Sequence, residues 1–211
     1  MTKKIAIFLT FLSLMLAAVP VQAQLLGDLR PAETLGMGSL KLGTSMGVFE
    51  DAFTLTGRVQ YGLASVVDLT ADLGLLDYEN TDDPEVLLGA GLEFQILQNS
   101  LGNPLDMTVG FFTEYYQLNN GRYHDFSDLA LGLSVAASRP INFPSGLEVI
   151  PYGQANIRVD RLKYGDNSDS DFNLGLNLGA ALPLSGTTQF VAEAQLDDEF
   201  GVLVGLNFLM W

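Results

Sequence analysis

The fold is decided by residues 200–211, Phe-Gly-Val-Leu-Val-Gly-Leu-Asn-Phe-Leu-Met-Trp, a run of strand-forming residues. Successive side chains of a strand point to opposite faces, so the run divides into two sets. The first set is wholly apolar and comprises Phe200, Val202, Val204, Leu206, Phe208 and Met210. The second comprises Gly201, Leu203, Gly205, Asn207 and Leu209. A transmembrane β-barrel accounts for such a strand, because its last strand pairs with its first and leaves no hydrogen-bonding edge facing lipid.

This stretch resembles the carboxy-terminal sorting signal of bacterial outer-membrane β-barrel proteins, in which an aromatic residue ends an alternating strand. The residues that carry the resemblance are Phe208 and Trp211, although Trp211 shares its phase with Asn207 and not with the apolar set. A bulge near the end, or a Trp side chain turned into the periplasmic rim, would account for that departure. The resemblance implies periplasmic chaperones and the barrel-assembly machinery as partners. The alternative is a buried strand of a soluble domain.

Residues 1–23 have the pattern of a secretory signal peptide. Lys3 and Lys4 precede a short apolar core, and Val21-Gln22-Ala23 is a small-residue cleavage site, so we expect Gln24 to begin the mature protein. A retained membrane helix is the less favoured alternative, because the apolar core is short. The pattern therefore predicts export to the periplasm with cleavage of the signal.

After cleavage, residues 24–35 are expected to form a short periplasmic lead and residues 36–211 a single transmembrane barrel. The chain has 10 Lys and Arg against 25 Asp and Glu, and this acidity excludes nucleic acid as a partner. Its mean hydropathy is nonetheless positive, at +0.25. Beyond the signal, no run approaches the ~18 apolar residues that a spanning helix needs. The absence of cysteine excludes a lipoprotein anchor and disulfides.

Alternation of apolar with polar or small residues recurs throughout the mature chain, and its period of two indicates strands. The alternating segments are 39–48, 53–61, 67–75, 86–96, 106–115, 128–138, 148–159, 172–182, 189–196 and 200–211. An even number of strands places both termini on one side of the membrane. We therefore expect an all-β fold, an antiparallel up-and-down transmembrane β-barrel of ten strands in the outer membrane of a Gram-negative cell. Eight strands are the alternative if two segments are misassigned.

Acidic residues gather in alternate connections between the segments, which hold 16 of the 25. With the amino terminus in the periplasm, these connections face outward. We expect part of this rim to bind Ca²⁺ or Mg²⁺ loosely together with the phosphates of lipopolysaccharide. The residues of this divalent-ion rim are Asp166, Asp169, Asp171, Asp197, Asp198 and Glu199. A specific metal site is not expected, because Asp171 and Asn177 stand where an EF-hand loop has Gly and Glu.

Aromatic residues flank both ends of the segments, which is typical of the interfacial girdles of membrane barrels. The residues assigned to the outer girdle are Phe49, Phe53, Tyr78, Tyr115, Tyr116, Tyr164 and Phe172. Those assigned to the inner girdle are Tyr61, Phe94, Phe143, Tyr152 and Phe190. Their rings are expected to lie at the two membrane surfaces.

The lumen-facing phase contains charged residues of both signs near the expected strand centres. This belt comprises Lys41, Arg58, Asp72, Glu93, Glu114, Arg158 and Glu193. Isolated charges in a low-dielectric interior are costly unless they are paired. We therefore expect the belt to pair within itself and fill the lumen, with Arg58 shared between Asp68 and Asp72. The alternative is a narrow passage with a weak preference for cations.

His124, which precedes Asp125, is the only histidine. Some outer-membrane barrels are enzymes: a protease family uses a His–Asp dyad, and a lipid A deacylase family uses His, Ser and Glu. The Ser that the deacylase pattern places two residues after His is Phe126 here. We therefore expect no enzyme, no catalytic residue and no cofactor. The expected function is that of an integral outer-membrane barrel with a structural or surface-presenting role, in contact with outer-membrane lipid and lipopolysaccharide. A narrow channel or transport barrel for small or apolar solutes is the second interpretation, and a hydrolase at the rim the third.

Overall fold

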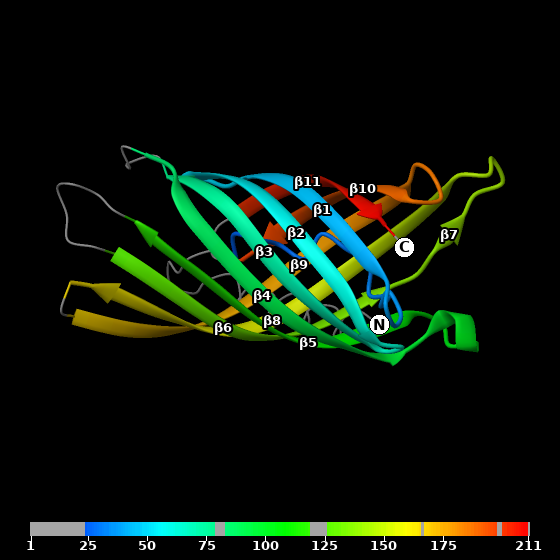
Figure 1. The fold of residues 1–211 in the computed structure, drawn as a ribbon, viewed down its shortest axis with the longest axis horizontal. Coiled ribbons are helices and arrows are strands. Elements are labelled where there is room, and N and C mark those ends of the chain that lie inside the picture. Colours follow the sequence, from blue (N-terminus) through cyan, green and yellow to red (C-terminus); the bar gives the residue numbers. More distant parts are fainter. Residues whose placement is uncertain (1–23, 79–82, 119–125, 166, 198–199, 211) are drawn as a thin grey trace, which may run out of the picture.

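The computed structural model describes residues 24–78, 83–118, 126–165, 167–197 and 200–210. Within these residues, ten long strands form an antiparallel ring (Figure 1). They are β1 Leu40–Val48, β2 Ala52–Ala64, β3 Val67–Tyr78, β4 Glu85–Leu97, β5 Asp106–Leu118, β6 Phe126–Ser138, β8 Glu148–Tyr164, β9 Asn167–Pro183, β10 Thr188–Leu196 and β11 Phe200–Leu209. A 3-10 turn, η1 Asn99–Leu101, and a two-residue strand, β7 Ile141–Asn142, lie in the connections. No helix among the described residues is long and apolar enough to cross a membrane.

The ring is closed by its first and last strands. β1 pairs antiparallel with β11, from Lys41 opposite Leu209 to Val48 opposite Val202. Every other strand of the ring pairs with its neighbours in the chain, with β6 passing directly to β8 while β7 pairs with β8 outside the ring. The expectation of ten strands is therefore confirmed, and the alternative of eight is not.

Polar and apolar side chains take the faces that the alternation predicts. On β9, Phe172 and Leu174 are 64% and 49% exposed, whereas Asn173 and Asn177 are 3% and 1% exposed. On β11, Val202 is exposed and Leu203 is fully buried. This distribution inverts that of a soluble protein, because the wall is apolar outside and largely polar inside.

Residues 24–32 lie buried inside the ring, with Glu33 exposed and Thr34 and Leu35 half-buried, whereas the sequence predicts a periplasmic lead over residues 24–35. Figure 1 shows this segment in dark blue between the strands. Gln24, Leu25, Leu26, Asp28, Leu29, Arg30 and Ala32 are all buried. The three leucines belong to an apolar cluster with lumen-facing side chains of the wall, among them Leu87 and Leu203. A segment with three leucines has apolar surface to remove from water, and the lumen offers both apolar contacts and hydrogen-bonding groups.

Several aromatic rings assigned to the girdles also lie inside the barrel. Phe49, Tyr116 and Tyr152 are each 5% exposed or less. The ring of Phe49 occupies space left by Gly201, since a Cβ there would lie 2.5 Å from two of its carbons. The girdle assignment is therefore wrong for these three residues. Gly179 makes room for Tyr152 in the same way, since a Cβ there would collide with its ring.

Candidate functional site: the filled lumen

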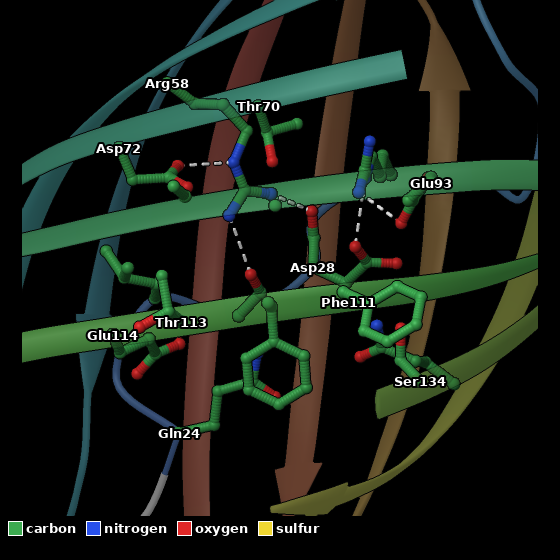
Figure 2. Close-up of a pocket in the computed structure, with 17 residues that line it drawn as sticks. Gln24, Asp28, Arg58, Thr70, Asp72, Glu93, Phe111, Thr113, Glu114 and Ser134 are labelled. Atoms are coloured by element: carbon green, nitrogen blue, oxygen red, sulfur yellow. Dashed lines mark hydrogen bonds and ion pairs between the residues drawn. The ribbon is translucent and has the colours of Figure 1, made fainter. Parts of the chain in front are cut away.

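Arg58 joins the wall to the enclosed segment. Its Nε lies 2.5 Å from Asp72 Oδ1, and Figure 2 shows the side chain reaching from β2 toward Asp72 and Asp28. The two terminal nitrogens donate to the backbone carbonyl oxygens of Asp28 and Gly27, the latter at 2.8 Å. Asp68, expected to share Arg58, instead accepts hydrogen bonds from the Gln60 side chain at 2.6 Å and from the Leu35 backbone N–H at 2.9 Å. The Arg58–Asp72 pair is thus confirmed and the shared arrangement is wrong.

Glu93 is paired with Arg30, a residue of the enclosed segment that the expected belt did not include. One Arg30 Nη contacts Glu93 Oε1, and its Nε lies 3.0 Å from Asp28 Oδ1, with all three side chains buried. Burial alone would lower the pKa of the Arg30 guanidinium, but the Glu93 and Asp28 carboxylates more than offset it. The pKa of Arg30 is therefore raised, and its charge is retained inside the barrel.

Glu114 and Glu193 bind backbone N–H groups, and no Lys or Arg nitrogen of a described residue lies within 4.0 Å of either carboxylate. The Leu25 N–H donates to Glu114 at 3.2 Å. Glu193 accepts from the consecutive N–H groups of Asp28 and Leu29, at 3.0 and 2.8 Å. It also accepts from the Tyr152 hydroxyl at 2.9 Å and the Gln195 amide at 3.2 Å. Four donors stabilise the charged form of a buried carboxylate without any cation.

Further polar side chains of the wall complete the contacts with residues 24–35. The Ser138 hydroxyl accepts from the Ala32 N–H at 2.9 Å, and Asn207 donates to the Leu29 carbonyl at 3.1 Å. The Thr34 hydroxyl donates to the side-chain amide oxygen of Gln95 at 2.6 Å. The segment is therefore held along its length by side chains of the wall.

Arg158 binds two carboxylates near the end of the barrel where the acidic connections lie. Its Nε is 2.8 Å from Asp160 Oδ2, and one Nη contacts Asp197. Asp197 was assigned to the divalent-ion rim, but its side chain is only 1% exposed and turned inward. Asp169 is exposed and Asp171 half-buried on β9, while Asp166, Asp198 and Glu199 lie outside the described residues. In the described part of the chain, no group of three or more acidic, His or Cys side chains is arranged to hold a metal ion.

Lys41 stands apart from the rest of the belt. It is the second residue of β1, near the mouth and not near a strand centre, and no carboxylate of a described residue lies within 4.0 Å of its amine. It lines a cavity of about 310 Å³ at this mouth, together with Glu33, Pro183, Thr188 and Asn207. Deeper in the lumen, between Arg58, Glu93 and Glu114, the cavity left is only about 30 Å³. That volume holds about two water molecules.

The remaining predicted residues lie at the edges of what the structure describes. Phe208 faces outward on β11 and is 38% exposed, while Trp211 lies outside the described residues. His124 and Asp125 also lie outside them. Sequence reasoning missed the enclosed segment and Arg30. The available signal was the trio Leu25, Leu26 and Leu29, which is unusual for a lead exposed to water.

Comparison with known proteins finds no matching family model and no matching curated protein. Solved structures do match. The KdgM porin is 7% identical, with 81% of this chain and 99% of the porin covered and a TM-score of 0.42. An outer membrane channel from Pseudomonas putida F1 is 12% identical, with coverages of 90% and 100% and a TM-score of 0.41. A de novo designed transmembrane β-barrel is 15% identical, with coverages of 84% and 99% and a TM-score of 0.40.

The architecture follows from the chain's own strand pairing and faces. The ring has no free strand edge, because β1 and β11 pair along their length. Leucine, valine and phenylalanine side chains cover the outer wall, while Asn, Gln, Thr and charged side chains point inward. A polar interior with an apolar exterior requires an apolar surrounding. The chain therefore has the fold of a small outer-membrane β-barrel protein.

Proposed function

We propose that this protein is an integral barrel of the outer membrane, closed at rest and without catalytic activity, with a structural or surface-presenting role. The observation that carries the proposal is the filled lumen. Residues 24–32 are buried in the interior, and the cavity between Arg58, Glu93 and Glu114 beside them is about 30 Å³. A hydrated ion needs a continuous path, and a space for about two waters supplies none. The second interpretation, a narrow channel, would require this segment to be displaced.

The charged side chains of the lumen support closure as well as filling. Arg58 and Arg158 each contact at least one buried carboxylate, and Arg30 pairs with Glu93. Buried ion pairs resist separation, because removing one partner leaves a charge in a low-dielectric space. In this proposal the belt acts together with the enclosed segment, which supplies partners that the wall does not provide for itself.

At the acidic end, we propose that the barrel meets lipopolysaccharide through shared divalent cations. The exposed Asp169 and the half-buried Asp171 support this part of the proposal, because both lie among the first residues of β9, at the end of the barrel where the acidic connections gather. Asp197 does not contribute, since it pairs with Arg158 inside. Assembly would use the barrel-assembly machinery and periplasmic chaperones.

The test is ion conductance. Purified protein is refolded and inserted into planar lipid bilayers, and its folding is checked by the different gel mobility of heated and unheated samples. We expect insertion without steady conductance. A stable open conductance in the unmodified protein would remove the closed-barrel proposal and favour the channel.

A further inference from the structure

The wall recognises the backbone of residues 24–35 more than their side chains. Glu193 accepts from two consecutive N–H groups, Glu114 from the N–H of Leu25, and Arg58 donates to two consecutive carbonyls. Asp68, Ser138 and Asn207 make similar contacts with backbone groups. Such contacts are available to peptides of many sequences, because every residue except proline carries the same donor and acceptor.

The enclosed segment takes no part in the sheet. Among the described residues, the backbone–backbone hydrogen bonds outside the strands include none from residues 24–35, and no strand pairing involves them. The seam between β1 and β11 and the pairing of β1 with β2 are complete without the segment. Its departure would break side-chain contacts and leave every ladder of the ring intact.

A glycine hinge connects the segment to the barrel. Gly36 and Gly38 have φ of +81° and +83°, and a Cβ at either would meet nothing within 4 Å. The anchor lies just beyond, where Gly38 N–H donates to the Gly62 carbonyl at 2.8 Å and Gly62 N–H to the Ser39 carbonyl at 2.9 Å. Glycine adopts positive φ without steric cost and leaves the backbone free to rotate. The segment can therefore swing about Gly36 while β1 stays in place.

The segment also holds a conformation that favours release. Leu29 has φ of +51°, the one positive value for a non-glycine residue in the described part of the chain. An L-residue with a bulky side chain disfavours this region, so the bound segment is strained there. Its contacts with the wall have to overcome that strain, which lowers the net affinity of the lumen for it.

Without residues 24–35, the lumen would be strongly acidic. Eight carboxylates of the described strands are buried on the inward face, against Lys41, Arg58 and Arg158. The carboxylates are Asp68, Asp72, Glu93, Asp106, Glu114, Asp128, Asp160 and Glu193. Rings of carboxylates around a narrow pore favour cations.

We infer that the lumen wall is a binding site for the backbone of an irregular peptide, with residues 24–35 as its tethered ligand, and that release of this ligand opens a cation-selective pore. The inference rests on the proposed function only in taking the occupied barrel as closed. Its ligand class is a short peptide without regular secondary structure. The tether raises the effective concentration of the resident peptide, so a free peptide binds well only after the resident one has left.

The first experiment removes the ligand and returns it. A variant that begins at Gly36 is refolded, its native gel mobility is verified, and its current is recorded in planar bilayers. We expect a steady, cation-selective conductance that the synthetic peptide QLLGDLRPAETL, residues 24–35, blocks. The control peptide has Arg30→Glu, which places a carboxylate beside Glu93 and should weaken block by about tenfold or more. An open pore that neither peptide blocks overturns the peptide site.

A second experiment keeps every residue, and so does not depend on folding of the truncated chain. Arg30→Glu in the full-length protein opposes Glu93 and Asp28, and we expect it to release the segment and produce conductance. If this variant has native gel mobility but shows no conductance, the inferred release of the segment is refuted. The closed-barrel proposal is tested separately with the unmodified protein, where a steady current would refute it. Even then, block of the truncated variant by the peptide decides whether the lumen binds peptide.

Disulfide locking then identifies the moving part. The natural chain has no cysteine, so introduced thiols are the only ones. Ala32→Cys with Ser138→Cys joins the segment to β6, where the Ala32 nitrogen and the Ser138 hydroxyl are 2.9 Å apart. In the Arg30→Glu background, oxidation of this pair should abolish the current and reduction restore it. The matched control is Ser45→Cys with Thr56→Cys, which links β1 to β2 within the wall where the two hydroxyls are 2.5 Å apart. If oxidation abolishes the current equally in the variant with the segment disulfide and in the variant with the wall disulfide, movement of the segment is contradicted.

Discussion

Replacement of Arg58 by alanine should destabilise the barrel through the carboxylate that it leaves behind. Asp72 has a side chain only 6% exposed and lies 2.5 Å from the Arg58 guanidinium. Removing one partner of a buried ion pair typically costs about 3–5 kcal/mol, because the remaining charge has neither water nor a counter-charge. The hydrogen bonds to the Gly27 and Asp28 carbonyls are lost as well. We therefore expect Arg58→Ala to lower the free energy of unfolding by about 3–5 kcal/mol.

The double variant Arg58→Ala/Asp72→Asn separates the energetic contribution of the ion pair from that of the packing of the Arg58 aliphatic chain. Asp72→Asn removes the stranded charge, so Arg58→Ala with Asp72→Asn should lose less than the two single changes added together, by about 2 kcal/mol. Unfolding is measured by urea titration in lipid vesicles, with the folded fraction read from the gel mobility of unheated samples. If the two single losses simply add, the pair is not coupled and the reasoning fails. Arg58→Ala should also admit small cations, because Arg58 holds the enclosed segment through two of its carbonyls.

The location of the protein is tested by fractionation. It should be recovered with the outer membrane and change gel mobility on heating. Recovery as a soluble periplasmic protein would contradict an outer-membrane location. On the outer wall, Leu176→Arg should destabilise by about 2–4 kcal/mol, because a charge near the bilayer midplane faces lipid; Leu176→Ala is the control, and equal losses in a urea titration would mean that the residue does not face lipid. Inside, Gly201→Ala should cost about 1–3 kcal/mol through collision with the Phe49 ring. Adding Phe49→Ala should recover part of that loss, and a further, fully additive loss would argue against the contact.

The alternation of side chains was sufficient to predict the wall. In residues 172–182 of β9 each outward residue is apolar and each inward residue is small or polar, so a period of two identifies both the strand and its faces. The Arg58–Asp72 pair was predictable for the same reason, since the short turn between β2 and β3 sets their register. These features depend on residues close together in sequence or in adjacent strands.

The contents of the lumen depend on contacts that no period encodes. Glu193 meets Asp28 and Leu29, which lie 165 and 164 residues away in the chain. The partner of Glu93 is Arg30, and the partner of Arg158 includes Asp197, which follows β10 and had been assigned to the outer rim. The sequence therefore predicted one lumen pair, Arg58–Asp72, but not the partners of Glu93, Glu193 and Arg158. An irregular segment carries no alternation that would place it inside a barrel.

The seam between β1 and β11 constrains the order of assembly. Lys41 pairs with Leu209, so the ring cannot close before almost the entire chain has been synthesised. Contacts between such distant residues form late and slowly, because the intervening chain must first be ordered. The segment 24–35 immediately precedes β1 and is enclosed by the same ring. The segment must lie in the lumen before β11 pairs with β1, or it must enter afterwards through the mouth beside Gly36. Pairing of β1 with β11 thus competes with placement of residues 24–35 in the lumen. The relative rates of these two steps determine what fraction of newly assembled barrels contains the segment.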